Sequence, residues 1–141
     1  MNNTRHLTLQ AGERVFLNGA VVKFDRKVSI EILNTVEYLR EHQVMQVEET
    51  KTPLRQLYFV VQTMMIDPAS RAGARAMYDD SYAWLMRTFS NMHVRSGLEE
   101  VNGHVKGGNL LEGLRTLRTL FSTEDQILGR ATVQDRFLEA V

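Results

Sequence analysis

Apolar and polar residues alternate with a period of two along the first third of the chain. The alternation is clearest at residues 7–9 and 28–32, and β-branched residues are common in this region. Both features are typical of strands that bury one face. Between these segments, Asn18-Gly19 separates two short apolar runs, and such a pair favours the positive φ angles of a tight hairpin turn. The pattern therefore predicts antiparallel strands within residues 6–33.

After Thr52 the apolar residues recur every three or four positions, which is the spacing of a helix. Thr52 and Pro53 are favourable as an N-cap and a first helical residue, and Asp67-Pro68 ends this helix. The later patterns predict further helices: around residues 77–89, from the capping-box spacing Ser96–Glu99 onward, from Asn109 to 121, from Ser122, and over 132–140.

The two patterns together predict an α+β chain. A β-rich N-terminal part, residues 1–48, forms antiparallel β hairpins or a small sheet, and a helical C-terminal part, residues 52–141, forms a bundle. Residues 34–47 fit a strand or a helix, and we favour an extended segment there. The polar residues 48–51 read as a loop, and both parts are expected to pack as one compact unit.

Composition restricts the class of protein further. The chain has 141 residues, 43% of them hydrophobic and 24% charged, as expected for one soluble domain. There are no cysteines, which excludes disulfides and thiolate chemistry. We find no apolar run long enough to cross a bilayer and no apolar segment of a signal peptide near the start. These features predict a cytoplasmic protein without a membrane partner.

No residue pattern indicates an active site. The four histidines, listed in order, are His6, His42, His93 and His104, and no two lie close enough in sequence to share a metal from one element. Adjacent carboxylates diverge on a helix, so they rarely converge on one atom. Nucleophile-elbow, dinucleotide-binding and phosphate-loop motifs are missing from the sequence. We therefore expect no enzyme activity, no cofactor and no metal.

Two sets of residues are candidates for binding. Five cations lie on or beside the predicted strands and are suited to RNA phosphates, although an ordinary charged solvent face gives the same pattern. They are Arg5, Arg14, Lys23, Arg26 and Lys27. The net charge of the whole chain is +0, which does not indicate DNA binding. The first helix carries a wide apolar stripe that is either core or an interface for a partner helix or a second copy: Leu54, Leu57, Tyr58, Val61 and Met65.

Four segments of the sequence are distinctive: AGERVFLNGAV at residues 11–21, DRKV at 25–28, TPLRQLYF at 52–59 and EDQIL at 124–128. Together they resemble the flagellum biosynthesis repressor family FlbT. The strand region also has a fainter similarity to the RNA-binding regulator CsrA. Several separate blocks in the same order make the resemblance to FlbT specific.

The resemblance implies a post-transcriptional regulator that binds the 5′ leader of flagellin mRNA and promotes its degradation, although some relatives act positively. A second small protein, FlaF, is the usual functional counterpart in this family. The five cations would then contact the leader. The alternative is a protein-interaction module, in which the helical part binds flagellin, FlaF or another flagellar component, and effects on mRNA are indirect.

Overall fold

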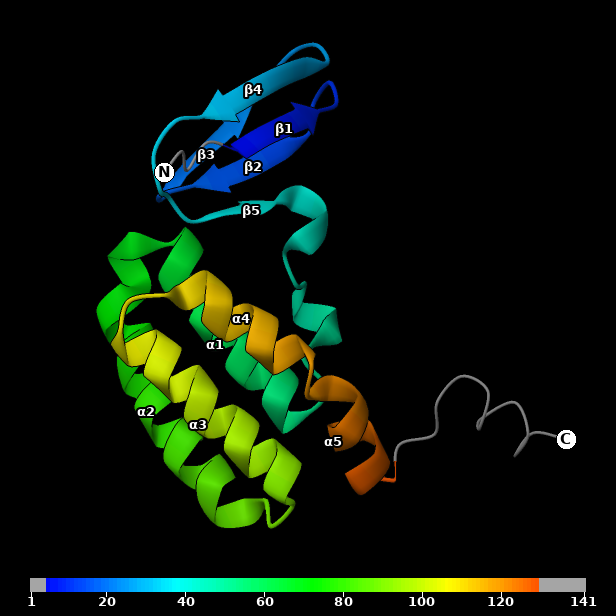
Figure 1. Cartoon of the computed structure of the whole chain (residues 1–141), viewed down its shortest axis with the longest axis vertical. Helices are drawn as coiled ribbons and strands as arrows, with labels where there is room; N and C mark the ends of the chain where they lie inside the picture. Colours follow the sequence, from blue (N-terminus) through cyan, green and yellow to red (C-terminus); the bar gives the residue numbers. More distant parts are fainter. Residues whose placement is uncertain (1–4, 130–141) are drawn as a thin grey trace, which may run out of the picture.

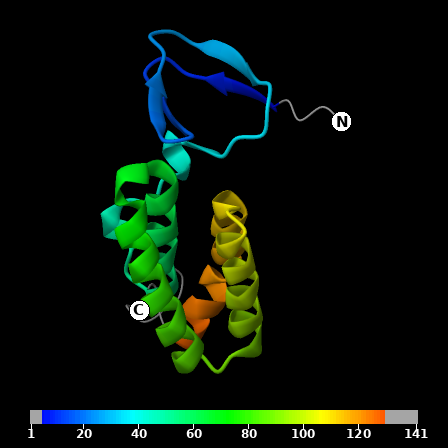
Figure 2. The same cartoon turned by 90° about the vertical axis from the view of Figure 1, so that its left-hand side faces the viewer.

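The computed structural model describes residues 5–129, which form a β-sheet part and a helical part stacked along one axis (Figures 1 and 2). The strands, in chain order, are β1 (Arg5–Leu9), β2 (Arg14–Leu17), β3 (Ala20–Lys23), β4 (Val28–Ile32) and β5 (Tyr38–Arg40). The α-helices are α1 (Pro53–Ile66), α2 (Arg71–Thr88), α3 (Met92–Lys106), α4 (Leu110–Arg118) and α5 (Phe121–Ile127). This arrangement confirms the α+β prediction. We call residues 5–40 the sheet part and residues 53–129 the helical part.

The strands pair as two small antiparallel sheets. β1 pairs with β4, whereas β2 lies between β3 and β5. Asn18 and Gly19 connect β2 to β3 with φ angles of 50° and 87°, which confirms the predicted hairpin turn. Residues 38–40 are extended, as favoured for the ambiguous segment, but a short 3₁₀ helix, Glu41–Gln43, follows at once.

The sheet part has a small hydrophobic core of its own. Its buried members are Leu7, Leu9, Val15 and Ile32, and partly buried side chains surround them. Residues 27, 29 and 31 are exposed, which is the outward face that the alternation predicted. A short strand of alternating character can bury only one face, so the other face carries the polar and charged side chains.

Helix α1 is the centre of the larger core, which extends through the whole helical part. It packs against α2, α4 and α5. All five residues of its apolar stripe have exposed fractions between 0% and 6%: Leu54, Leu57, Tyr58, Val61 and Met65. The stripe is therefore the core of this chain and not a surface for a partner helix, which corrects the interface alternative. Within residues 5–129, every helix is too short or too polar to cross a bilayer.

The start of α1 is held by the last described helix. Thr52 accepts a hydrogen bond from the Arg55 amide, as predicted for an N-cap. Glu124 of α5 accepts the Leu54 N–H at 2.7 Å, and Arg55 pairs with Asp125 at 2.8 Å. A carboxylate at a helix N-terminus satisfies free N–H groups and favours the helix dipole. Two segments that are 70 residues apart in sequence are thereby joined.

One predicted helix boundary was wrong. Helix α3 begins at Met92, where the Asn91 side chain accepts a hydrogen bond from the Val94 amide. Ser96 therefore lies inside this helix and caps nothing. Gly97, beside it, packs so closely that a Cβ would lie 2.5 Å from the Leu120 side chain. The predicted helix at residues 132–140 lies outside the described residues.

The two parts meet at a small number of specific contacts. A Cβ at Gly19 would lie 2.7 Å from the ring of Pro68, so the β2–β3 turn touches the short 3₁₀ helix Pro68–Ser70. Glu37 accepts a hydrogen bond from the Leu111 amide at the start of α4. Phe16 and Leu39 contribute to the helical core from the sheet side. The sheet part is thus fixed on one end of the helical part.

Candidate nucleic-acid interface

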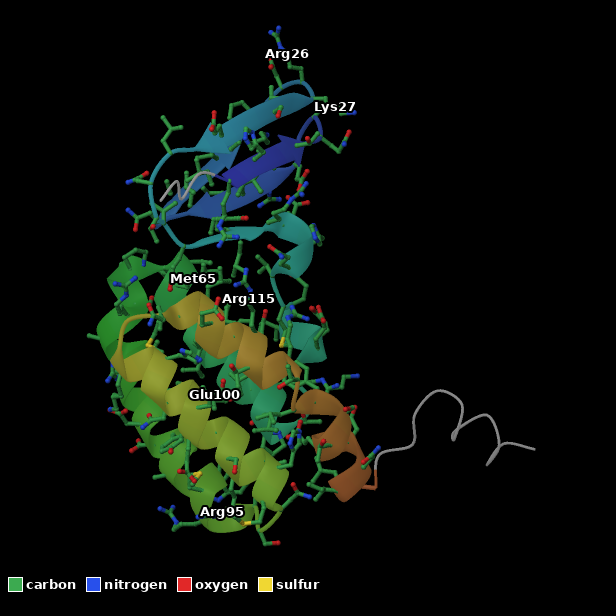
Figure 3. The ribbon with its side chains drawn as sticks, in the orientation of Figure 1. Arg26, Lys27, Met65, Arg95, Glu100 and Arg115 are labelled. Carbon is green, nitrogen blue, oxygen red and sulfur yellow. The ribbon has the colours of Figure 1, made fainter. Side chains whose placement is uncertain are left out.

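Four of the five candidate cations lie at one end of the sheet part. Arg14 and Lys23 are directly opposite each other in the β2–β3 register. Arg26 and Lys27 follow in the turn before β4, at the end of the molecule that is remote from the helices (Figure 3). The Gly12 N–H donates to the Phe24 carbonyl, which holds the β1–β2 turn against the end of β3. We call the group Arg14, Lys23, Arg26 and Lys27 the basic end.

Arg5 does not belong to this group. It pairs with Ile32 at one end of the β1–β4 ladder, whereas Leu9 pairs with Val28 at the other end. At roughly 3.3 Å per residue, four residue steps separate these ends by about 13 Å. Arg5 instead lines a hollow beside the helical part, together with Arg115 of α4.

The cations of the basic end are exposed and only partly matched by acids. Arg14 lies 3.3 Å from Glu41, and Arg26 lies 3.2 Å from its neighbour Asp25. Exposed pairs of this kind contribute little and exchange readily. Lys23 and Lys27 have no carboxylate within 4.0 Å among residues 5–129. The basic end can therefore offer positive charge to a phosphate.

A partly buried ion pair between Arg40 and Glu13 lies beside the basic end. Arg40 of β5 contacts Glu13 at 2.9 Å and donates to the Thr8 carbonyl at 2.7 Å. The hydrogen bond from the Gln10 amide lowers the pKa of Glu13 most strongly, and Arg40 lowers it further. Glu13, which precedes Arg14 in the chain, is thus engaged from two sides. Sequence reasoning missed this pair because nothing local connects residues 13 and 40.

The two phenylalanines of the sheet part do not add a stacking surface. Phe16 is partly buried against the helical core, and Phe24 is partly buried against the sheet core. Base stacking requires an open ring face. Both rings therefore serve packing.

A second basic region lies where the sheet and helical parts meet. A cleft of about 990 Å³ is lined by Asn18, by the loop at residues 34–37 and by the beginning of α2, where Arg71 and Arg75 lie. Lys106 at the end of α3 and the buried residues Met64 and Met65 of α1 also line the cleft. We call it the junction cleft. The same loop separates it from the hollow of about 460 Å³ that contains Arg5.

The sequence carries no local signal for the junction cleft. Its lining comes from five separate segments, and their proximity depends on how the sheet part docks. Among residues 5–129, no three His, Asp or Glu side chains are grouped so that they could hold a metal. Within this described range, Glu124 is the one fully buried carboxylate, and it caps α1.

Comparisons with known proteins agree with the segments described above. The family model "Flagellar protein FlbT" matches residues 6–128. A protein of Chelativorans sp. named "Probable flagellum biosynthesis repressor protein FlbT" is 43% identical and covers 100% of this chain and 99% of its own. Relatives with the same name from Rhizobium etli and Brucella ovis are 38% and 42% identical; they cover 100% and 90% of this chain, and 95% and 84% of their own.

No solved structure matches the chain. The family match covers both the sheet part and the helical part, including the basic end and the junction cleft. The relatives also align over nearly their whole length. The chain therefore belongs to the FlbT family of flagellar proteins.

Proposed function

We propose that this protein represses flagellum biosynthesis by binding the 5′ leader of flagellin mRNA and promoting its degradation. The names of the relatives support the repressor role. The observation that supports the RNA contact is the basic end, where four exposed cations lie at one end of the sheet part and two of them have no carboxylate partner in the described chain. Positive charges on one solvent face bind a phosphate backbone by releasing its counterions.

The test is direct binding of the purified protein to a labelled flagellin leader. For a single strand, each phosphate contact contributes roughly −0.7 to the slope of log affinity against log salt, so four contacts predict about −2.8. The fifth candidate, Arg5, would bring the slope to about −3.5 if it engaged the same strand. A slope near zero would contradict phosphate contact.

The decisive variant reverses charge at the remote turn. Arg26→Glu with Lys27→Glu is expected to abolish leader binding and leave the fold intact, because both side chains are exposed. The matched control is Lys51→Glu with Arg87→Glu, which changes the net charge equally at two exposed positions of the helical side. If both double variants bind equally, the basic end is not the contact.

The alternative is a protein-interaction module that binds FlaF, flagellin or a second copy. One observation favours such a surface: Met77 and Trp84 of α2 are 58% and 47% exposed, which is high for large apolar side chains. If the wild-type protein binds no leader but acquires binding when FlaF is added, this alternative replaces direct RNA contact. A pull-down with the Met77→Ser and Trp84→Ser variants then tests the surface on α2.

A further inference from the structure

The junction cleft has two chemically different walls. One wall carries the uncharged polar residues Asn18, Asn34 and Thr35 from the sheet side. The other carries Arg71, Arg75 and Lys106 from the helical side. Its volume of about 990 Å³ is at the upper end of ordinary ligand pockets, which hold one small molecule or one residue of a polymer.

The cations of this cleft exceed the acids that face them. Arg75 and Lys106 share one carboxylate, Asp79, at 3.6 Å and 3.5 Å. Arg71 donates only its Nε, to the Met64 carbonyl, and its outer nitrogens are not used within residues 5–129. Glu37, the acid that lines the cleft itself, accepts a hydrogen bond from the Leu111 amide. The helical wall therefore has positive charge available for an anion such as a phosphate.

The polar wall is equally unoccupied by the protein's own groups. The side chains of Asn18, Asn34 and Thr35 are exposed or at the surface and make no hydrogen bond within the described chain. An asparagine amide presents a donor and an acceptor side by side, which matches the edge of a nucleobase. Met64, Met65 and Val36 supply an apolar floor between the walls, and Figure 3 shows Met65 at the end of α1 that faces the sheet part.

We propose that the junction cleft holds one unpaired nucleotide of a single-stranded RNA. Its phosphate lies against Arg71, Arg75 and Lys106, and its base lies against Asn18, Asn34 and Thr35. This proposal rests on the RNA binding proposed above and adds the source of sequence preference, because phosphate contacts position RNA but carry no base identity. An acidic peptide would use the cations but not the amide wall.

The position of Arg5 fits the same assignment. Arg5 lies in the adjoining hollow, across the loop at residues 34–37, with Arg115 of α4. Figure 3 shows Arg115 on the side of α4 that is nearest the sheet part. Arg5, which does not join the basic end, thus adds a cation beside the cleft.

The test compares the flagellin leader with a scrambled RNA of the same length and composition. Asn34→Ala with Thr35→Ala is expected to weaken leader binding about tenfold, with little change for the scrambled RNA, because base hydrogen bonds are lost and phosphate contacts are kept. The salt slope should stay unchanged. Arg71→Ala with Lys106→Ala should weaken both RNAs and make the slope shallower. The control is Thr88→Ala with Gln126→Ala, two exposed polar residues away from the cleft.

The outcomes separate the two proposals. Wild-type protein that binds neither RNA overturns both. Wild-type protein that binds the leader, with cleft variants that discriminate as well as it does, overturns the cleft alone. As a probe that does not depend on the leader, adenosine, cytidine, guanosine and uridine monophosphates are titrated into ¹⁵N-labelled protein. Shifts at residues 34–37, 71–75 and 106 on adding a nucleotide support the cleft. Shifts at these residues with hexaglutamate but with none of the nucleotides would identify a peptide site and overturn the proposal.

Discussion

The sheet part and the helical part differ in where their charged and polar side chains lie. The sheet part buries four apolar residues and leaves the cations of its basic end in solvent, two of them with no acid partner among residues 5–129. The helical part buries a continuous core through α1 to α4 and holds its buried polar groups with specific partners. Glu124 and Gln62 are such groups, at 0% and 1% exposure. Charge left in solvent and polar groups held in a packed core thus lie in different regions of one small chain.

The pKa values of two carboxylates, Glu13 and Glu124, are shifted in opposite directions in the two parts. In the sheet part, hydrogen bonds from Gln10 and Arg40 lower the pKa of Glu13. In the helical part, burial raises the pKa of Glu124, even though Thr52, Leu54 and Arg55 act in the other direction. One group is stabilised as an anion at a surface, and the other is an anion in a dry environment. Acid should therefore affect the two regions differently.

The largest expected effect is loss of a buried leucine from the helical core. Leu57→Ala should lower the free energy of unfolding by roughly 2–5 kcal/mol, because Leu57 is 1% exposed among packed helices that cannot collapse around a cavity. Leu9→Ala, at 0% exposure in the small core, should cost less because that core has more freedom to close. Urea unfolding measures both, and the exposed Gln56→Ala is the control. Equal losses of unfolding free energy in Leu9→Ala and Leu57→Ala would show that the two cores do not differ in this way.

The next effect concerns a buried polar contact of the helical part. Gln62 accepts from the Met45 amide at 2.7 Å and donates to the Met45 carbonyl at 3.0 Å. Gln62→Leu leaves two buried backbone groups without a partner, each costing about 1–3 kcal/mol. Gln62→Glu keeps the acceptor, loses the donor and also buries a charge. We therefore expect it to lose at least as much stability as Gln62→Leu. Thermal unfolding of both variants gives the result, and an unchanged Tm for Gln62→Leu would contradict it.

Much of this contrast could be predicted from local patterns. The hairpin at Asn18-Gly19, the cap at Thr52 and the change from period two to period 3.6 each depend on neighbours in sequence. The predicted hairpin also brings Arg14 and Lys23 close together, so part of the basic end follows from the sequence. Local chemistry was enough for these features.

Features that depend on docking were not predictable. Arg5 was grouped with the other cations because the sequence gives no strand register, and the β1–β4 ladder places it at the opposite end. The junction cleft, the Arg40–Glu13 pair and the Glu124 cap each join residues that are far apart in sequence. The start of α3 was misplaced because two cap patterns compete, and only Asn91 forms the hydrogen bond. Tertiary packing decided each case.

A smaller effect is expected at the contact between the two parts. Gly19 has a φ of 87° and no room for a Cβ against Pro68. Gly19→Ala should cost about 1–2 kcal/mol for the left-handed conformation alone, and more if Pro68 must move. Gly12→Ala, at a φ of 78° with open space around it, is the matched control for backbone strain without the contact. Amide exchange near Gly19 and Pro68 that rises in both variants alike would show that the contact does not fix the sheet part.

The smallest effect is a difference in pH dependence between Glu124 and Glu13. The folded pKa of Glu124 lies above its ordinary value of 4.5, so the folded state takes up a proton first. The cost of its buried charge is therefore present at pH 7 and is relieved as pH falls through the raised pKa. Glu124→Gln removes this titration but keeps an oxygen for the Leu54 amide, so the wild type should gain stability relative to the variant as pH falls from 7 toward 4.5. Glu13 has a lowered pKa, and its contribution is lost as pH falls through that lowered value. Glu13→Gln should consequently be less stable than the wild type at pH 7 and approach it in acid. Urea unfolding at several pH values measures both differences, and curves that run parallel for the wild type and Glu124→Gln would show that this carboxylate is not held in a dry environment.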